Sequence, residues 1–165
     1  METRDRPVLL VLTRQDLPTL DRSRFASADG LRRGAYVLSD TPSDKSDSLQ
    51  PELILIASGS EVGLIVAAAE RLRGEGIAVR CVSMPCWELF DAQSQDYRDS
   101  VLPPSIGARL AVEMAVAQGW QRYVGDRGDI LSVERFGASA PAEILLPEYG
   151  FTVDNVCARA KALLG

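Results

Sequence analysis

Residues 53–84 carry the clearest hydrophobic pattern in the chain and predict a strand, a helix and a second strand in succession. Residues 53–57 form a continuous apolar run, which is typical of a strand covered on both faces. From Val62 to Leu72 apolar side chains recur at helical spacing, and the glycines that follow predict the end of the helix. Residues 77–84 are mainly apolar again. Joints this short predict a βαβ unit with parallel strands and a right-handed crossover.

The turn before the predicted helix contains Ser58, Gly59 and Ser60. Ser58 and Glu61 have the spacing of a capping box, with Ser60 as the alternative cap. Because backbone N–H groups at a helix start can hold an anion, Ser58, Gly59 and Ser60 are also a candidate anion-binding site. The turn lacks the G-x-G-x-x-G fingerprint and the lysine of a P-loop. Glu61, expected on the polar face of the helix, would repel a phosphate. A capped strand-to-helix turn is therefore the stronger interpretation.

The remaining pattern continues the alternation of strands and helices. Strands are predicted at 7–13, 35–39, 108–113 and 129–134, and helices or single helical turns at 85–93, 94–102, 141–146 and 152–164. Pro141 suits the first position of its helix, and Thr152 is the expected cap of the last helix. This alternation is typical of a doubly wound α/β sheet.

Two stretches lack any hydrophobic period. Residues 19–34 mix charged residues with serine, alanine and glycine, and we expect them to form a weakly structured linker. Residues 40–48 are almost entirely polar, and we expect an exposed loop there. Neither stretch contributes to the predicted core.

Composition and charge argue against several classes of function. The 165 residues suffice for one full domain, and a net charge of −5 argues against nucleic acid as the main partner. No apolar run approaches the roughly 20 residues of a membrane span, and the first residues lack the layout of a signal peptide. The three cysteines, Cys81, Cys86 and Cys157, fit no common zinc spacing and indicate a reducing compartment, so we expect a cytoplasmic protein.

The sequence contains no histidine, which excludes a histidine-based triad, metal site or acid–base group within this chain. Cys86 has no base near it in the sequence and is expected to be unreactive. Trp87, Phe90, Trp120 and Tyr123 are more typical of core or interface packing than of a pocket lining. We therefore assign no catalytic residue.

Arg14 is the other candidate binding residue. It follows the strand predicted at 7–13, at the edge where α/β folds place ligand groups. Its guanidinium fork suits a phosphate or a carboxylate. Judged from residue type alone, an exposed or ion-paired arginine is the commoner case.

Several blocks of sequence, in order along nearly the whole chain, are similar to the C-terminal part of bacterial-type transketolases. They are residues 12–18 (LTRQDLP), 51–62 (PELILIASGSEV), 82–90 (VSMPCWELF), 119–125 (GWQRYVG), 136–143 (FGASAPAE) and 149–156 (YGFTVDNV). The block at 82–90 favours transketolase over other thiamine-dependent enzymes that share the domain type, such as dehydrogenases and deoxyxylulose-phosphate synthases.

The resemblance implies an enzyme that moves a two-carbon ketol unit between sugar phosphates, as a homodimer with thiamine diphosphate and a divalent metal, magnesium. It implies that the residues binding cofactor and metal precede this chain, so no cofactor or metal ligand is expected here. Arg14 matches the arginine that contacts the phosphate end of the sugar in the family. The isolated chain is expected to be inactive and to serve packing against other domains and support of the dimer.

The resemblance also implies the complete fold, a three-layer α/β/α domain with a mostly parallel five-stranded sheet. In it Tyr36 to Leu38 would be an antiparallel edge strand. Residues 1–18 would be the last strand of a pyrimidine-binding domain, 19–34 a linker and 35–165 the C-terminal domain. Two alternatives stay open: a freestanding domain of this fold that binds a small anion or a partner, and the same domain of another thiamine-diphosphate enzyme.

Overall fold

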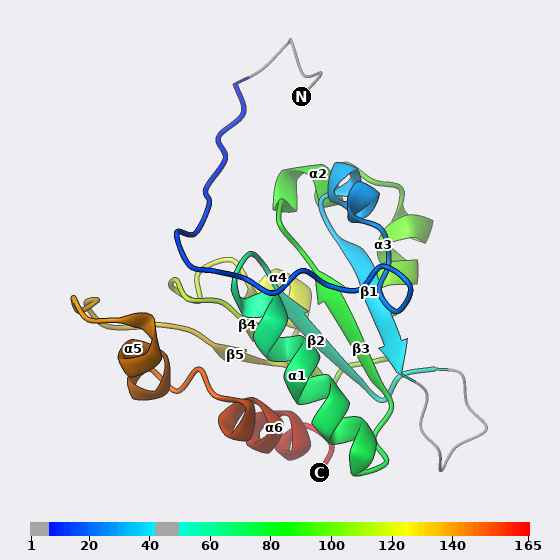
Figure 1. Ribbon diagram of the computed structural model, residues 1–165. Coiled ribbons are helices and arrows are strands. Elements are labelled where there is room, and N and C mark those ends of the chain that lie inside the picture. The colour runs from blue at the N-terminus through cyan, green and yellow to red at the C-terminus, as the bar shows by residue number, and fades with distance from the viewer. Residues whose placement is uncertain (1–6, 42–49) are drawn as a thin grey trace.

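The computed structural model describes residues 7–41 and 50–165, in which helices cover both faces of one five-stranded sheet (Figure 1). The strands are β1 (Tyr36–Thr41), β2 (Leu53–Ala57), β3 (Val79–Ser83), β4 (Arg109–Val112) and β5 (Asp129–Leu131). Their order across the sheet is β1-β3-β2-β4-β5, and every neighbouring pair is parallel except β1 with β3. The predicted three-layer fold with one antiparallel edge strand is thereby confirmed.

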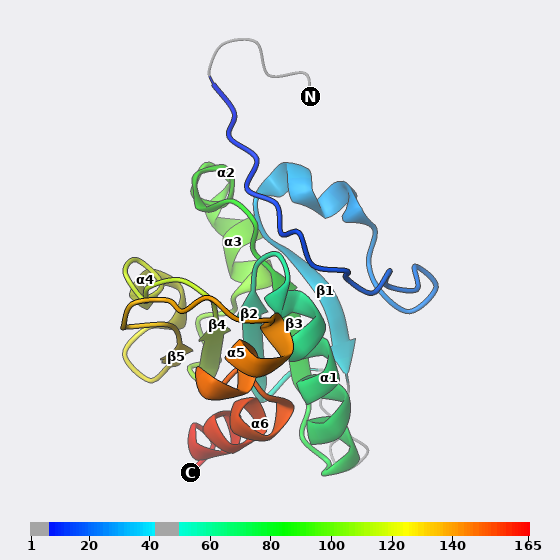
Figure 2. The same ribbon diagram turned by 60° about the vertical axis from the view of Figure 1, so that its left-hand side comes forward.

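Two sets of helices form the outer layers, on opposite faces of the sheet (Figures 1 and 2). One layer contains α1 (Glu61–Gly74), α5 (Ala142–Glu148) and α6 (Val153–Ala162), and the other contains α2 (Trp87–Asp91), α3 (Gln95–Val101) and α4 (Gln121–Val124). A 3₁₀ helix, η1 (Ala28–Arg33), precedes β1. Within the described residues, none of these helices is long and apolar enough to cross a membrane.

The central strand β2 divides its side chains between two cores, as a strand buried on both faces must. Leu53, Leu55 and Ala57 pack with α1 and α6, whereas Ile54 and Ile56 pack with the aromatic side chains of the opposite layer. All five are fully buried, which explains why the run has no polar position. The core under α1 and α6 is mainly aliphatic, and the other core is rich in aromatic rings.

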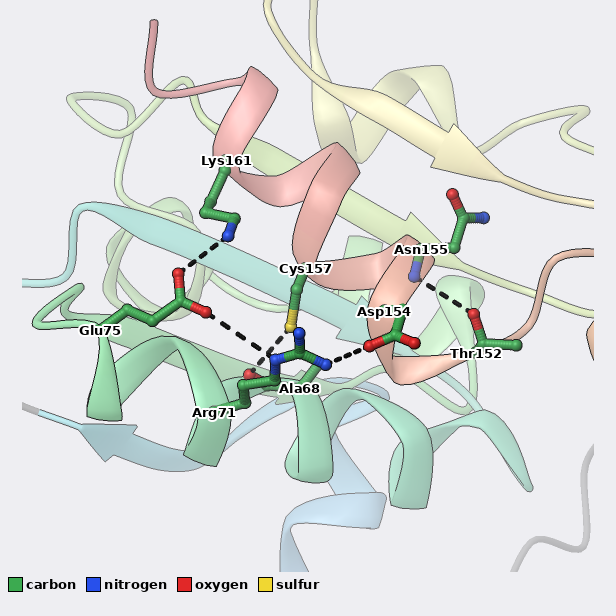
Figure 3. A network of polar contacts seen from close by, with 8 residues as sticks. All are labelled: Ala68, Arg71, Glu75, Thr152, Asp154, Asn155, Cys157 and Lys161. Carbon is green, nitrogen blue, oxygen red and sulfur yellow. Dashed lines mark hydrogen bonds and ion pairs between the residues drawn. The ribbon is translucent and has the colours of Figure 1, made fainter.

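Helices α1 and α6 pack closely and are joined at their surface by ion pairs (Figure 3). Arg71 pairs with Asp154, and Glu75 accepts from the Lys161 ammonium at 2.9 Å. Between them the Sγ of Cys157 lies 3.6 Å from the carbonyl oxygen of Ala68, so small residues bring the two backbones together. The hydroxyl of Thr152 accepts from the backbone N–H of Asn155 at 3.2 Å, which confirms Thr152 as the helix cap.

The N-terminal part of the chain differs from the prediction in two ways. The buried strand predicted at 7–13 is not formed, and Leu9, Val11 and Leu12 are each more than three quarters exposed. The described chain offers that segment no strand partner, and an unpaired strand gains nothing over hydrated backbone. Residues 19–34, predicted to be weakly structured, are ordered instead, because Leu20 and Phe25 pack against the core and residues 28–33 form η1.

Smaller differences concern helix starts and one loop. Pro141 occupies the cap position of α5 rather than its first helical position. The exposed loop predicted at 40–48 lies mostly outside the described residues. The remaining predicted strands and helices are all present, with their ends shifted by at most three residues.

Candidate functional site at the carboxyl edge of the sheet

The sheet changes direction at the β2–β4 pair, and this pair positions the candidate site. The chain leaves β2 through α1 to reach β3 on one side, then returns across β2 to place β4 on the other side. In open α/β sheets the crevice at the carboxyl ends of such a pair is where ligands bind. Here those ends carry Ser58, Gly59 and Ser60 after β2, and Glu113 after β4.

The hydroxyls of Ser58 and Ser60 donate hydrogen bonds to carboxylates instead of capping α1. The Ser58 hydroxyl donates to Oε2 of Glu113 at 2.8 Å, and the Ser60 hydroxyl donates to Oε1 of Glu61 at 2.6 Å. Neither hydroxyl caps the helix, so the capping box predicted from Ser58 and Glu61 is wrong. The Ser58 hydroxyl thus makes a charge-assisted hydrogen bond to Glu113, which is partly buried.

Glu61 is buried, with 7% of its surface exposed, and does not lie on the polar face of α1 as predicted. Burial raises the pKa of the Glu61 carboxyl, while the Ser60 hydroxyl and the backbone N–H of Met114 act in the opposite direction. Burial also raises the pKa of Glu113; the Ser58 hydrogen bond lowers it and the nearby charge of Glu61 raises it further. Within the described chain, neither carboxylate has a lysine or arginine at ion-pair distance.

These carboxylates change what the turn can do chemically. Ser58, Gly59 and Ser60 lie at the start of α1, as predicted, but the electrostatics there favour a proton or a positive group over an anion. Sequence reasoning missed Glu113 as part of the site. The available signal was a single acidic residue directly after the buried run of β4. Because β4 and β2 are parallel neighbours, it lies at the edge of the sheet where β2 also ends.

Arg14 lies on an exposed, extended segment before the first turn of chain that packs on the domain. Its side chain forms no ion pair with another described residue. Asp21, one of the acidic residues near it in sequence, instead accepts from the N–H and the hydroxyl of Ser23, and these bonds lower its pKa. The guanidinium of Arg14 is therefore available to a group outside the described residues.

The loop between β5 and α5 also reaches the carboxyl edge and exposes one large aromatic side chain. Phe136 is 99% exposed, although the loop around it is well held. The Glu134 carboxylate accepts from the backbone N–H of Ala117 at 2.7 Å, and the Tyr149 hydroxyl donates to the Phe136 carbonyl at 3.0 Å. The Arg135 guanidinium lies 4.5 Å above the Tyr149 ring. The backbone is thus ordered while the phenyl ring meets water.

The other candidates named from the sequence are structural. Phe90, Trp120 and Tyr123 are buried, and Trp87 packs edge-on against Trp120 with ring centroids 5.1 Å apart, so these aromatics form core rather than a pocket. Cys86 is a partly buried free cysteine, and its thiol donates to a carboxylate oxygen of Glu88 at 3.4 Å. Among residues 7–41 and 50–165, no group of three acidic or cysteine side chains could hold a metal ion.

Comparison with known proteins agrees with this fold. Residues 34–152 match the family described as the transketolase-like C-terminal domain. The chain is 54% identical over all of its 165 residues to a transketolase of Geobacillus stearothermophilus and 50% identical over 164 residues to transketolase 1 of Escherichia coli. It spans 24% of the length of each.

Solved structures give the same result. The transketolase of Pichia stipitis in complex with sedoheptulose 7-phosphate superposes with a TM-score of 0.77 at 34% identity, covering 92% of this chain and 20% of that one. The transketolase of Leishmania mexicana superposes with a TM-score of 0.72 at 42% identity, covering 84% and 19%. The order of strands, the antiparallel edge and the matched residues all agree, and the chain belongs to the transketolase family, of which it forms the C-terminal domain.

Proposed function

We propose that this chain acts as the C-terminal part of a transketolase, an enzyme that transfers a two-carbon ketol unit between sugar phosphates. The observation that carries the proposal is the 54% identity to a transketolase over the whole of this chain. Because the chain spans about a quarter of that relative, the chemistry belongs to the complete enzyme, which we place in the cytoplasm as a homodimer. Alone, the 165 residues are expected to be inactive.

The cofactor of that enzyme is thiamine diphosphate with a divalent metal such as magnesium. The described residues of this chain do not fit the group, because they contain no cluster of ligands for a metal, and the Glu61 and Glu113 carboxylates would repel a diphosphate at the α1 turn. We therefore assign cofactor binding and activation to other parts of the enzyme and derive no step of the reaction from this domain.

The role proposed for this domain is packing against its neighbours and support of the dimer. Phe136 is exposed on an ordered loop, with Val116 and Ile144 also more than half exposed on the segments after β4 and in α5. Burying a phenyl ring from water contributes about 1.5–3 kcal/mol, so a rigid loop that exposes one suits an interface. The apolar residues Val8 to Leu12 are a second surface of this kind, which suits a strand joining another domain.

Arg14 is the proposed substrate-binding residue, through the phosphate of the sugar. Its guanidinium is exposed and forms no ion pair with another described residue, which supports this role, as does its match to the family's phosphate-contacting arginine. The deciding experiment uses the full-length enzyme with the Arg14→Ala and Arg14→Lys variants. Loss of a charge-assisted contact of about 1.5–3 kcal/mol predicts a rise of roughly 10- to 150-fold in KM for phosphorylated sugars. Lysine should recover only part, because an ammonium cannot form the fork.

The comparison with an unphosphorylated acceptor separates binding from general damage. KM for that acceptor should change little, since the lost contact is to the phosphate. Equal losses on both substrates would remove Arg14 from the site. A second test uses the isolated chain. Calorimetry that detects magnesium-dependent binding of thiamine diphosphate to this chain would contradict the assignment of cofactor binding to other parts of the enzyme.

A freestanding domain that binds a small anion at Ser58, Gly59 and Ser60 is the alternative. The carboxylates beside this turn, the buried Glu61 and the partly buried Glu113, make it the weaker candidate. Titration of the isolated chain with inorganic phosphate tests this alternative. The transketolase role predicts no binding at this turn, whereas the alternative predicts binding that Ser60→Ala weakens.

A further inference from the structure

Residues 17–34 are not a passive connection but a segment that follows the surface of the domain, and we call them the strap. In Figure 1 the strap crosses the start of α1 before it reaches η1 and β1. It first comes close to the domain at Pro18, whose side chain is exposed and whose Cγ lies 3.7 Å from the position that a Cβ on Gly63 would occupy. Leu20 and Phe25 follow, and both pack against the core under α1.

The strap is also held by polar contacts along its length. The carbonyl of Asp21 accepts from the backbone N–H of Arg24 and of Phe25, both at 3.0 Å, and forms a tight turn. The Arg24 guanidinium then reaches α1 and pairs with Glu70 at 2.7 Å. The N–H of Ala26 donates to the carbonyl of Leu38 in β1 at 2.9 Å. The strap is thus attached to both α1 and β1.

At its far end the strap is locked by close backbone packing. Gly34 has a φ of +83°, and a Cβ there would lie 2.3 Å from the carbonyl oxygen of Cys86, so only glycine fits. The N–H of Cys86 donates to the Gly34 carbonyl at 3.0 Å. Contacts at Leu20, Phe25 and Gly34 therefore hold the strap near its beginning, in its middle and at its end, which a flexible linker would not show.

Arg14 lies only four residues before Pro18. Four extended residues span at most about 14 Å, so anchoring Pro18 on α1 restricts where Arg14 can lie. We infer that the strap is a positioning device for substrate binding: by holding Pro18 against Gly63 it places the Arg14 guanidinium for the phosphate of the sugar. The inference rests on the proposed function of Arg14 and assigns Pro18 and Phe25 as positioning residues, with Gly63 as the neighbouring position that leaves room for Pro18.

Gly63 offers a matched pair of variants to test this. A methyl group at Gly63 would meet Pro18 at ordinary contact distance, so Gly63→Ala leaves the strap in place. Gly63→Phe puts a ring where Pro18 lies and lifts the start of the strap. Both replacements improve on glycine as helix formers, so neither weakens α1 by helix propensity. Their difference therefore reports on the strap.

In the full-length enzyme we expect Gly63→Phe to raise KM for a phosphorylated sugar about tenfold, within the roughly hundredfold that an ångström of misplacement can cause. KM for an unphosphorylated acceptor and kcat should change less than about twofold, and Gly63→Ala should match the parent enzyme. A uniform loss on both substrates, or no loss at all in Gly63→Phe, would overturn the inference.

A second variant covers the case in which Gly63→Phe does not fold. Phe25→Ala removes the middle anchor and should raise KM for the phosphorylated sugar in the same selective way. In the 165-residue chain it should also speed tryptic cleavage after Arg22 and Arg24, while cleavage after the exposed Arg14 stays unchanged. Unchanged cleavage at Arg22 and Arg24 would show that Phe25 does not hold the strap.

The Arg14 variants separate this inference from the proposed function. If Arg14→Ala leaves the phosphorylated substrate unaffected, the binding role of Arg14 fails. If Arg14→Ala is selective but Gly63→Phe and Phe25→Ala are not, Arg14 binds phosphate without help from the strap. In the double variant Arg14→Ala with Gly63→Phe, the second change should add little to KM for the phosphorylated sugar, because both act through one contact.

Discussion

Two phenylalanines, Phe90 in α2 and Phe136 in the loop before α5, show how differently two regions of this domain are built. Phe90 is 2% exposed, with ring centroids of Tyr123 and Tyr97 at 6.1 and 6.4 Å. Phe136 is 99% exposed on a loop whose backbone is hydrogen-bonded in place. The interior is complete within this chain, whereas the carboxyl edge displays apolar surface that contributes nothing to the fold. Stability and assembly therefore depend on different residues.

The largest expected effect comes from making the same change in both regions. Phe90→Ala should lower the free energy of unfolding by about 3–5 kcal/mol, because it removes a buried ring and leaves a cavity. Phe136→Ala should leave it within about 0.5 kcal/mol, since an exposed ring loses no packing. Urea denaturation of the isolated chain measures both. Comparable losses in the two variants would mean that the loop is part of the core after all.

Two arginines, the partly buried Arg109 and the exposed Arg122, allow the same comparison for a polar side chain. Arg109 at the start of β4 donates to the carbonyl oxygens of Ile106 and Tyr123 at 2.8 Å, and to those of Leu102 and Pro103 at 3.1 and 2.8 Å. Arg109→Met should cost about 2–4 kcal/mol, because half-buried carbonyls lose their donor. The exposed Arg122→Met is the matched control and should cost at most about 1 kcal/mol. Thermal unfolding of the two variants checks the ranking.

Glu113 marks the boundary between the two regions, and its variant should respond to pH. Because burial raises the folded-state pKa of Glu113 above its unfolded value, its contribution to stability is full at low pH and is lost as pH rises through the folded pKa. Glu113→Gln should remove that loss and be more stable than the parent at pH 7.5, by less than about 1.5 kcal/mol. Near pH 4 the advantage should vanish.

The exposed Glu143→Gln is the control for this measurement and should show no such dependence on pH. Denaturation midpoints at the two pH values decide the point. A Glu113→Gln protein that is less stable than the parent at pH 7.5 would contradict a destabilising charge at this position.

The smallest expected change in unfolding free energy comes from an exposed ion pair between α1 and α6. Arg71→Met removes the ion pair with Asp154, whose side chains are 49% and 83% exposed. Exposed pairs contribute about 0–1 kcal/mol and less at high salt. We therefore expect a change in unfolding free energy below about 1 kcal/mol that disappears in 1 M sodium chloride. A larger, salt-independent loss would show that the guanidinium stem packs in the core.

The sequence predicted the parts of the fold that local patterns determine. The run Leu53–Ala57, the helical spacing after it and the cap at Thr152 each have a short-range cause, and all three are present. The antiparallel direction of β1 came from the resemblance to a family, because strand order depends on contacts between distant residues.

What the sequence did not show arises from contacts between distant segments. Glu61 is buried because the chain after β4 passes over the start of α1, and the Ser58 hydroxyl turns to Glu113, 55 residues away. The strap lacks a hydrophobic period because Leu20 and Phe25 are only two anchors on an irregular path. Arg14 is exposed in this structure, so its role depends on groups outside the chain and stays a prediction, as do the domain boundaries.

The order of strands also has a consequence for the route by which the chain folds. The pairing of β2 with β3 joins residues 26 positions apart along the sequence, as in Leu53 with Val79, whereas Cys157 meets Ala68 across 89 positions. Closing the longer loop costs more chain entropy, and the rate of folding falls as such separations grow. We therefore expect the βαβ unit to form early and the docking of α6 to close the domain as a late step.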